Sequence, residues 1–169
     1  MGNQHGRPRL RRRRLDLMTL DPDEVEDIPY QGQKIPCRIC DVYDGDSFTG
    51  LLNFHNYPIK IKIRLLGVDA PEMVPRGVKD PELRELEKRA ATIVRDHICH
   101  IILNKIVMVE LIDHDKYGGR LLAHVYIDND GVEQLLSEHL IDDGYVRRYH
   151  GERKEPWTEA ELVSGPYAL

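Results

Sequence analysis

Three short segments of the sequence place acidic and basic residues beside turn-forming ones, where regular elements are expected to end. They are residues 44–47 (DGDS), 64–72 (RLLGVDAPE) and 115–123 (DKYGGRLLA). Carboxylate oxygens suit a hard cation such as calcium, and guanidinium groups form charge-assisted, bidentate hydrogen bonds with phosphate oxygens. If the three segments meet in space, their residue types therefore suit metal-assisted attack of water on a phosphodiester.

Each segment also has a purely structural interpretation when it is taken alone. Asp-Gly-Asp is a common hairpin turn, and Pro71 could simply end the pairing of a strand. The loop at residues 116–120 (KYGGR) could be a hairpin with charged side chains. Their joint occurrence favours a function, because three acids and two arginines at strand ends can converge on one mouth of a small barrel.

The elements that must position these segments follow from the hydrophobic pattern. Residues 57–68 alternate between apolar and basic side chains, which predicts a half-buried strand with a cationic outer face. Residues 82–103 carry apolar side chains at spacings of three and four, which predicts a long helix. Further strands are predicted at residues 35–43, 47–53, 106–112 and 121–127, a short helix around Leu136, and a last helical turn at 159–163 capped by Thr158.

This order of elements predicts the fold class. Three strands, a long helix, two strands and a helix are the order of an OB-type barrel. We therefore expect a mainly β protein with helices (α+β), built on a five-stranded OB-type barrel with the long helix between strands three and four and further short helices. With 169 residues the chain has room for one domain, at 30–169, behind a disordered tail at 1–29.

Charge is unevenly distributed between tail and body. Residues 1–29 hold six arginines and six acids, so the net charge of −5 belongs to the remaining residues. An acidic body does not suit binding of nucleic acid by bulk electrostatics and would need a local basic patch or a metal ion. The arginines at residues 7–14 could contact phosphates, act as a nuclear or other address, or touch an anionic membrane surface.

Localisation is suggested by what the sequence lacks. It has no apolar run long enough to span a membrane and no apolar centre of a secretory signal. Its three cysteines, an odd number, suit a reducing compartment. We therefore expect an intracellular protein, cytoplasmic or nuclear, and a monomer. Cys37 and Cys40 are expected to point to opposite faces of their strand, which argues against a shared metal ion.

The three segments, in this order and near these spacings, resemble the staphylococcal nuclease-like (thermonuclease) family. Residues 132–149 (VEQLLSEHLIDDGYVRRY) add to this resemblance, which covers about residues 33–158. It implies an OB-type barrel and a calcium-dependent nuclease that hydrolyses phosphodiester bonds in DNA, RNA or both. The alternative is a non-catalytic OB-fold module that binds nucleic acid or protein.

The resemblance also implies roles for individual residues. The implied calcium ligands are Asp46, Asp69 and the backbone carbonyl of Ala70. Glu72 is implied to orient or deprotonate the attacking water, and Arg64 and Arg120 to bind the phosphate. The implied nucleotide-binding residues are Lys116 or Tyr117, and Tyr145 or Tyr149. The loop before Arg120 carries two glycines and looks one residue longer than the family's, so the choice between Lys116 and Tyr117 stays open. After Gly144 the register of the resemblance allows either Tyr145 or Tyr149.

Overall fold

The computed structural model describes residues 30–116 and 119–168, together with Met18, Asp21, Asp23 and Ile28. The predicted disordered tail at 1–29 therefore lies almost wholly outside the described residues, and Tyr117 lies outside them as well. Ile28 is buried and belongs to the hydrophobic core. The domain boundary stays a prediction.

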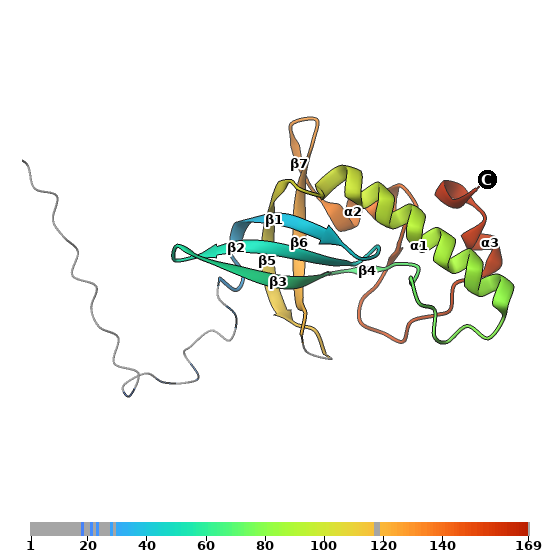
Figure 1. The fold of residues 1–169 in the computed structure, drawn as a ribbon, viewed down its shortest axis with the longest axis horizontal. Coiled ribbons are helices and arrows are strands. Elements are labelled where there is room, and N and C mark those ends of the chain that lie inside the picture. The colour runs from blue at the N-terminus through green and yellow to red at the C-terminus, as the bar shows by residue number, and fades with distance from the viewer. Residues whose placement is uncertain are drawn as a thin grey trace, which may run out of the picture.

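Five strands form a closed barrel (Figure 1). They are β1 (Lys34–Val42), β2 (Ser47–Phe54), β3 (Tyr57–Leu65), β5 (Ile106–His114) and β6 (Leu121–Asn129). Neighbours pair in the order β3-β2-β1-β5-β6, and β3 pairs with β6 in parallel to close the ring. The predicted OB-type barrel is confirmed, with the long helix between its third and fourth strands.

The helices lie together beside the barrel (Figure 1). They are α1 (Pro81–Ile102), α2 (Leu136–Asp142), α3 (Glu159–Leu162) and a 3₁₀ turn at Gly165–Tyr167. The side chain of Asp80 caps α1 by accepting from the backbone N–H of Glu82 at 2.9 Å. Thr158 and Glu161 form a capping box at α3, which confirms the predicted cap. None of the helices within the described residues is long and apolar enough to cross a membrane.

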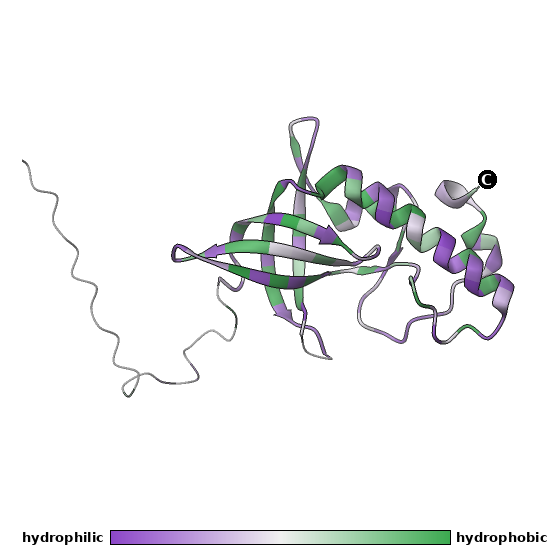
Figure 2. Cartoon of the chain, viewed as in Figure 1, coloured by the Kyte–Doolittle hydropathy of each residue, from purple (hydrophilic) through white to green (hydrophobic). Residues whose placement is uncertain are grey.

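Alternation along β3 follows the predicted pattern. Ile63 and Leu65 are buried in the core, whereas Lys60 and Lys62 are exposed. Figure 2 shows the corresponding change of hydropathy along the strands, and a similar division around α1. The core is mainly aliphatic, which agrees with the low share of aromatic residues in the sequence, 7%.

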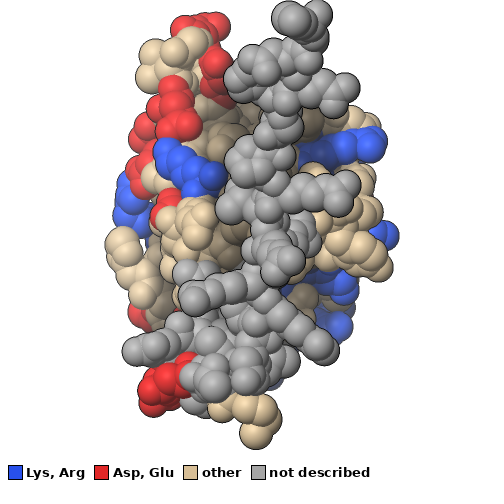
Figure 3. Space-filling model, turned by 90° about the vertical axis from the view of Figure 1, so that its left-hand side faces the viewer, with Lys and Arg blue, Asp and Glu red and all other residues tan. Residues whose placement is uncertain are grey.

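Charge on the surface is local. Figure 3 looks at the end of the molecule where the β2–β3 hairpin projects. Acidic side chains gather along its left edge with some basic ones between them, and further basic side chains lie along its right edge. Because the whole chain carries −5, any basic surface has to be a patch of this kind.

The predicted strand at 57–68 is interrupted, and this interruption matters for the site. β3 ends at Leu65, Gly67 turns the chain with a φ of 87°, and the short β4 (Val68–Asp69) follows. That φ favours glycine. β4 pairs with β8 (Arg147–Arg148) in a separate two-stranded sheet, and β7 (Val132–Leu135) extends β6 beyond the barrel. These short pairings have too few residues to show a period in the sequence.

Candidate active site at the barrel mouth

A groove of about 1140 Å³ opens at one mouth of the barrel. Its walls come from four parts of the chain: the turn before β2, the β3–β4 connection, the loop between β5 and β6, and residues 149–154. The three charged segments found in the sequence all contribute to it. We call it the mouth groove.

Gly45 allows two of these segments to touch. A Cβ atom built on Gly45 would lie 2.6 Å from the Cβ of Ala70 and 2.8 Å from Cγ1 of Val94 on α1. Both distances are shorter than real Cβ contacts, so only glycine fits between these side chains. The missing side chain therefore lets the Asp-Gly-Asp turn pack directly against the residues that follow β4.

Asp46 is buried, with 5% of its surface exposed, yet its carboxylate is fully engaged. Its Oδ1 accepts from the hydroxyl of Ser47 at 2.7 Å, and its Oδ2 lies 3.2 Å from Nη2 of Arg64. The backbone carbonyl of Asp46 accepts from the N–H of Leu65 at 2.7 Å, which holds the turn to the end of β3. Its own N–H donates to Oδ1 of Asp44 at 3.1 Å.

The two predicted arginines share a second buried acid, Asp115. Nε and Nη2 of Arg120 donate to Oδ2 of Asp115 at 3.0 and 2.7 Å, and its Nη1 donates to Oγ of Ser47 at 3.0 Å. Nη1 of Arg64 lies 3.8 Å from the same Oδ2. The parallel pairing of β3 with β6 places Arg64 opposite Leu122, close behind Arg120. Closure of the barrel therefore brings both guanidinium groups to one acid.

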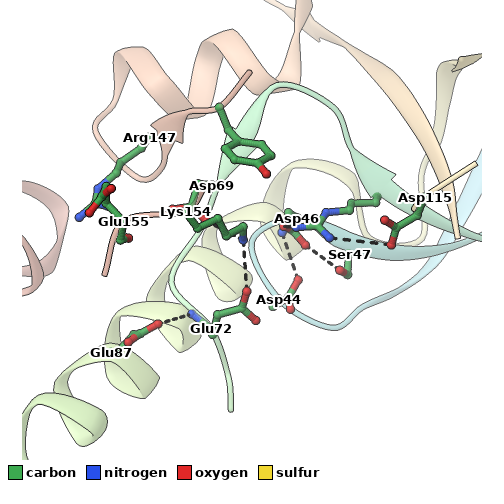
Figure 4. Close-up of polar contacts among 12 residues, drawn as sticks. Asp44, Asp46, Ser47, Asp69, Glu72, Glu87, Asp115, Arg147, Lys154 and Glu155 are labelled. Carbon is green, nitrogen blue, oxygen red and sulfur yellow. Dashed lines mark hydrogen bonds and ion pairs between the residues drawn. The ribbon is translucent and has the colours of Figure 1, made fainter. Parts of the chain in front are cut away.

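Asp69 and Glu72 hold a cation from the far end of the chain. Nζ of Lys154 lies 2.6 Å from Oδ1 of Asp69 and 3.3 Å from Oε1 of Glu72, so its ammonium group sits between the two acids (Figure 4). Asp69 is buried, whereas the Glu72 side chain is 49% exposed. The backbone N–H of Glu72 donates to Oε1 of the buried Glu87 on α1 at 3.1 Å.

Burial and neighbouring charges shift several pKa values at this mouth. Burial, and next the charge of Asp46, raise the pKa of Asp44 to about 7. Burial also raises the pKa of Glu87. For Lys154 burial acts in the opposite direction, but the contact with Asp69 outweighs it and the pKa rises. Burial therefore disfavours full ionisation of the acids at the mouth, and the ammonium group of Lys154 compensates part of their negative charge.

An apolar pocket of about 830 Å³ adjoins the mouth groove. Its walls include Val74, Leu83 and Trp157, and it shares Glu72 and Lys154 with the groove. The guanidinium of Arg147 lies over the Trp157 ring, 3.9 Å from its centroid, and fixes that ring from one side.

The predicted site residues do not all reach the mouth groove. Six of them line it: Asp46, Arg64, Glu72, Lys116, Arg120 and Tyr149. Asp69 borders the groove through its contact with Lys154, and Ala70 packs against Gly45. The ring of Tyr145 instead stacks on His97 of α1, with centroids 4.1 Å apart. Tyr149 donates its hydroxyl proton to the carbonyl of Glu152 at 2.8 Å. Of the two tyrosines left open, Tyr149 lines the mouth groove and Tyr145 does not.

Four charged residues of this mouth were not predicted from the sequence to have a role in the site: Asp44, Asp115, Glu87 and Lys154. Asp44 and Asp115 open two of the recognised segments, so the motifs contained the signal. Lys154 lies 82 residues from Glu72 in a polar stretch, and nothing in its surroundings singles it out. Glu87 falls on a helix rich in acids and bases, where burial cannot be read from the residue type.

The cysteines carry no joint site. Cys37 is fully buried against Gly50, and its burial raises the thiol pKa to about 12. Cys40 is partly buried and donates to the carbonyl of Thr49. All three cysteines are free thiols.

Comparison with known families gives one clear result. The chain has no match among the curated proteins. The family model described as staphylococcal nuclease homologue matches residues 62–164, which is 103 of the 169 residues and contains Arg64, Asp69, Glu72, Arg120 and Lys154. With its OB-type barrel and this charged mouth, the chain belongs to the staphylococcal nuclease homologue family.

Proposed function

We propose that this protein is a calcium-dependent endonuclease that hydrolyses phosphodiester bonds in DNA, RNA or both. The observation that carries the proposal is the convergence of Arg64, Arg120 and the acids Asp46, Asp69 and Glu72 around one groove. Membership of the family supports a nuclease-type or nucleic-acid-binding function. Calcium dependence and catalysis are our inference from the residues.

The residues at the mouth fit a calcium ion. Asp46 and Asp69 offer hard carboxylate oxygens, and Ala70 offers a carbonyl, which are the ligands calcium prefers. The ammonium group of Lys154 already lies on Asp69, so this position attracts a cation. Calcium bound there would neutralise charge that develops on a phosphate oxygen.

Arg64 and Arg120 are suited to hold the phosphate. Arginine has five N–H donors, and the bonds of Arg120 to Asp115 and Ser47 use three of them. Two N–H groups thus remain for phosphate oxygens, and the side chain is 31% exposed at the groove. Asp115 and Ser47 fix the plane of the guanidinium before a substrate arrives, which lowers the cost of organising it in the transition state.

Glu72 is the candidate base. Its side chain is half-exposed in the groove, where water has access, while its backbone is tied to Glu87. Positioned proton transfer of this kind contributes about 10²–10⁴-fold to a rate. The contact with Lys154 must loosen for Glu72 to accept a proton, so departure of the ammonium would prepare both the cation position and the base.

Contact with the nucleic acid would come from the rim. Lys116 is exposed and lines the groove together with Arg120 and Tyr149, whose ring offers a surface on which a base could stack. The adjoining apolar pocket next to Glu72 suits a flanking nucleobase. Tyr117, the other residue proposed for this role, lies outside the described residues.

A non-catalytic binding module is the second candidate. It is favoured by the ion pairs that already satisfy the mouth, since Arg64, Arg120 and Lys154 each have an acidic partner. Such a module would bind nucleic acid without calcium and leave it intact. It gives no reason, however, for burying Asp44, Asp46, Asp69 and Asp115 around one opening.

A cleavage assay separates the two candidates. Single- and double-stranded DNA and RNA are incubated with the protein in calcium, in magnesium or in chelator, and the product ends are mapped. We expect cleavage in calcium, less in magnesium because of its stricter octahedral geometry, and none in chelator. Asp46→Asn and Asp69→Asn should abolish it, whereas Asp130→Asn, in the exposed β6–β7 turn, should not. Binding without cleavage in calcium would establish the module instead.

A further inference from the structure

Two histidines and an aspartate meet where α1 lies beside α2. His97 comes from α1, His139 from α2, and Asp143 is the capping residue directly after α2. One nitrogen or oxygen atom from each lies within 4.8 Å of those of the other two. We propose that His97, His139 and Asp143 bind a divalent transition-metal ion, for which zinc is the best fit, at a site separate from the mouth groove.

His97 provides the strongest reason for a ligand at this place. Its Nε2 atom is buried and has no hydrogen-bond partner among the described residues. A buried polar atom left without a partner costs about 1–3 kcal/mol, so natural proteins rarely leave one unsatisfied. The ring cannot readily turn away, because it is stacked on Tyr145 with an angle of 18° between the ring planes. A metal ion would accept this unused lone pair.

His139 and Asp143 complete the cluster from the side that solvent can reach. Nε2 of His139 lies 3.6 Å from Oδ2 of Asp143, and these side chains are 20% and 45% exposed. The spacing of four residues puts them on the same face of α2. The rings of His97 and His139 lie 5.9 Å apart between centroids, with an angle of 22° between their planes. An ion can therefore enter from solvent and reach the buried nitrogen of His97.

The chemistry of the three donors selects the kind of metal. Two imidazole nitrogens with one carboxylate oxygen suit zinc and its neighbours rather than calcium, which prefers oxygen ligands alone. Zinc–nitrogen distances of about 2.1 Å put tetrahedral ligands roughly 3.4 Å apart. The pair of His139 and Asp143 is already close to that separation. Because both side chains are partly exposed, they have room to close on His97.

A bound ion would connect two helices that different parts of the chain supply. α1 precedes β5 in the chain, whereas α2 follows β7. Three protein ligands leave a fourth tetrahedral position open, for water or for a group from outside the protein.

The competing explanation is a simple ion pair between a protonated His139 and Asp143, with no metal.

Zinc binding to the full chain tests the proposal. The protein, without an affinity tag and stripped of metal, is titrated with Zn²⁺ by calorimetry, both as wild type and as Asp46→Asn/Asp69→Asn, which disables the mouth. We expect one zinc per chain in both proteins and a higher melting temperature with zinc. Among the eight histidines, ring signals in NMR spectra should shift for His97 and His139.

Matched variants identify the ligands. His97→Gln, His139→Gln and Asp143→Asn should each weaken zinc binding at least tenfold. His100→Gln should leave it unchanged, because His100 is exposed on the same helix and its ring bonds to the carbonyl of Asp96. Circular dichroism verifies that each variant is folded, and the exposed Asp143 is the least disturbing change. Absence of zinc binding in the disabled-mouth protein, or unchanged affinity in Asp143→Asn and His139→Gln, would overturn the proposal whatever the cleavage assay shows.

Discussion

The mouth groove and the histidine cluster both gather groups that bind metals, but they satisfy those groups differently. At the mouth, Asp69 already pairs with Lys154 and Asp46 with Arg64. In the cluster, a buried nitrogen of His97 has no partner among the described residues. A metal ion at the mouth must therefore compete with the side chains of Lys154 and Arg64, whereas a metal ion at the cluster would give the Nε2 atom of His97 a partner.

This difference teaches how one small domain could keep two metals apart. Oxygen donors surrounded by arginine and lysine favour a hard ion that competes by charge, and imidazole donors favour a softer one. Competition from Lys154 and Arg64 would also make calcium binding at the mouth weaker than the number of acids suggests. The following changes test that contrast, from the largest expected effect to the smallest.

Replacing either arginine of the mouth by lysine should have the largest effect. Arg64→Lys and Arg120→Lys keep the charge but lose the planar fork that meets two phosphate oxygens. Loss of one preorganised hydrogen-bond donor typically lowers kcat about 10²–10³-fold, so we expect a fall of this size with a smaller change in KM. Steady-state cleavage in calcium measures both. Arg38→Lys, on the exposed side of β1, is the control, and near-normal turnover of Arg120→Lys would contradict the bidentate role.

Gly45→Ala should break the contact on which the mouth depends. The new methyl group would meet Ala70 and Val94 at distances below 3 Å, and overpacking of this kind costs about 1–3 kcal/mol. We expect a lower urea midpoint with an unchanged slope, together with weaker calcium binding, because the turn carrying Asp46 must move. Gly77→Ala has open space around its Cβ and should change neither. Equal stability of the two variants would mean that the turn is not tightly packed.

Lys154→Met should show whether the lysine mainly competes with calcium for the acids or mainly stabilises the metal-free protein. Without the ammonium group the acids bind calcium more readily, while the metal-free protein loses the partner of the buried Asp69. A hydrogen bond to a charged group contributes about 1.5–3 kcal/mol, so calcium should bind at least tenfold more tightly. Titration and thermal unfolding, each with and without calcium, measure the two effects. Lys60→Met, exposed on β3, is the control, and weaker calcium binding in Lys154→Met would show that the lysine assists the metal.

The smallest effect concerns the pH dependence of stability. Burial raises the pKa of Glu87 above its value in the unfolded chain, so the folded protein holds this proton more tightly. Glu87 therefore stabilises the fold most below its unfolded pKa, and this contribution is lost as pH rises toward the folded pKa. Glu87→Gln keeps an acceptor for the N–H of Glu72 but cannot titrate. The free energy of unfolding is measured in chelator from pH 4 upward, and the wild type should lose stability relative to the variant as pH rises. Parallel curves of this free energy against pH would refute the raised pKa of Glu87.

Local patterns were enough to predict most of the fold. The period of β3, the spacing of apolar residues in α1 and the cap at Thr158 depend on residues close together in the sequence, and each is confirmed. β4 and β8 were not predicted, because each has two residues and exists only through its pairing partner. Gly67 marks the break between β3 and β4, but its positive φ is visible only in three dimensions.

The candidate site divides in the same way. The acids and arginines within the three segments could be found from their neighbours, and the structure brings Asp46, Arg64 and Arg120 together. Lys154 could not be found, because its role follows from contacts with residues more than eighty positions away. The histidine cluster escaped for a related reason, since His97 and His139 lie on different helices and form no sequence motif.

The pairing of β4 with β8 has a consequence for the order in which the molecule is made. Synthesis delivers both arginines and all the acids of the mouth before β8 and Lys154 emerge. Contacts between such distant positions close long loops, which is slow compared with forming the local hairpins. We therefore expect the barrel to acquire its shape first, and the β4–β8 pairing and the contact of Lys154 with Asp69 to form only when the last part of the chain folds back. In a chain that is still being synthesised, the acids of the mouth would therefore be open to cations before Lys154 can pair with them.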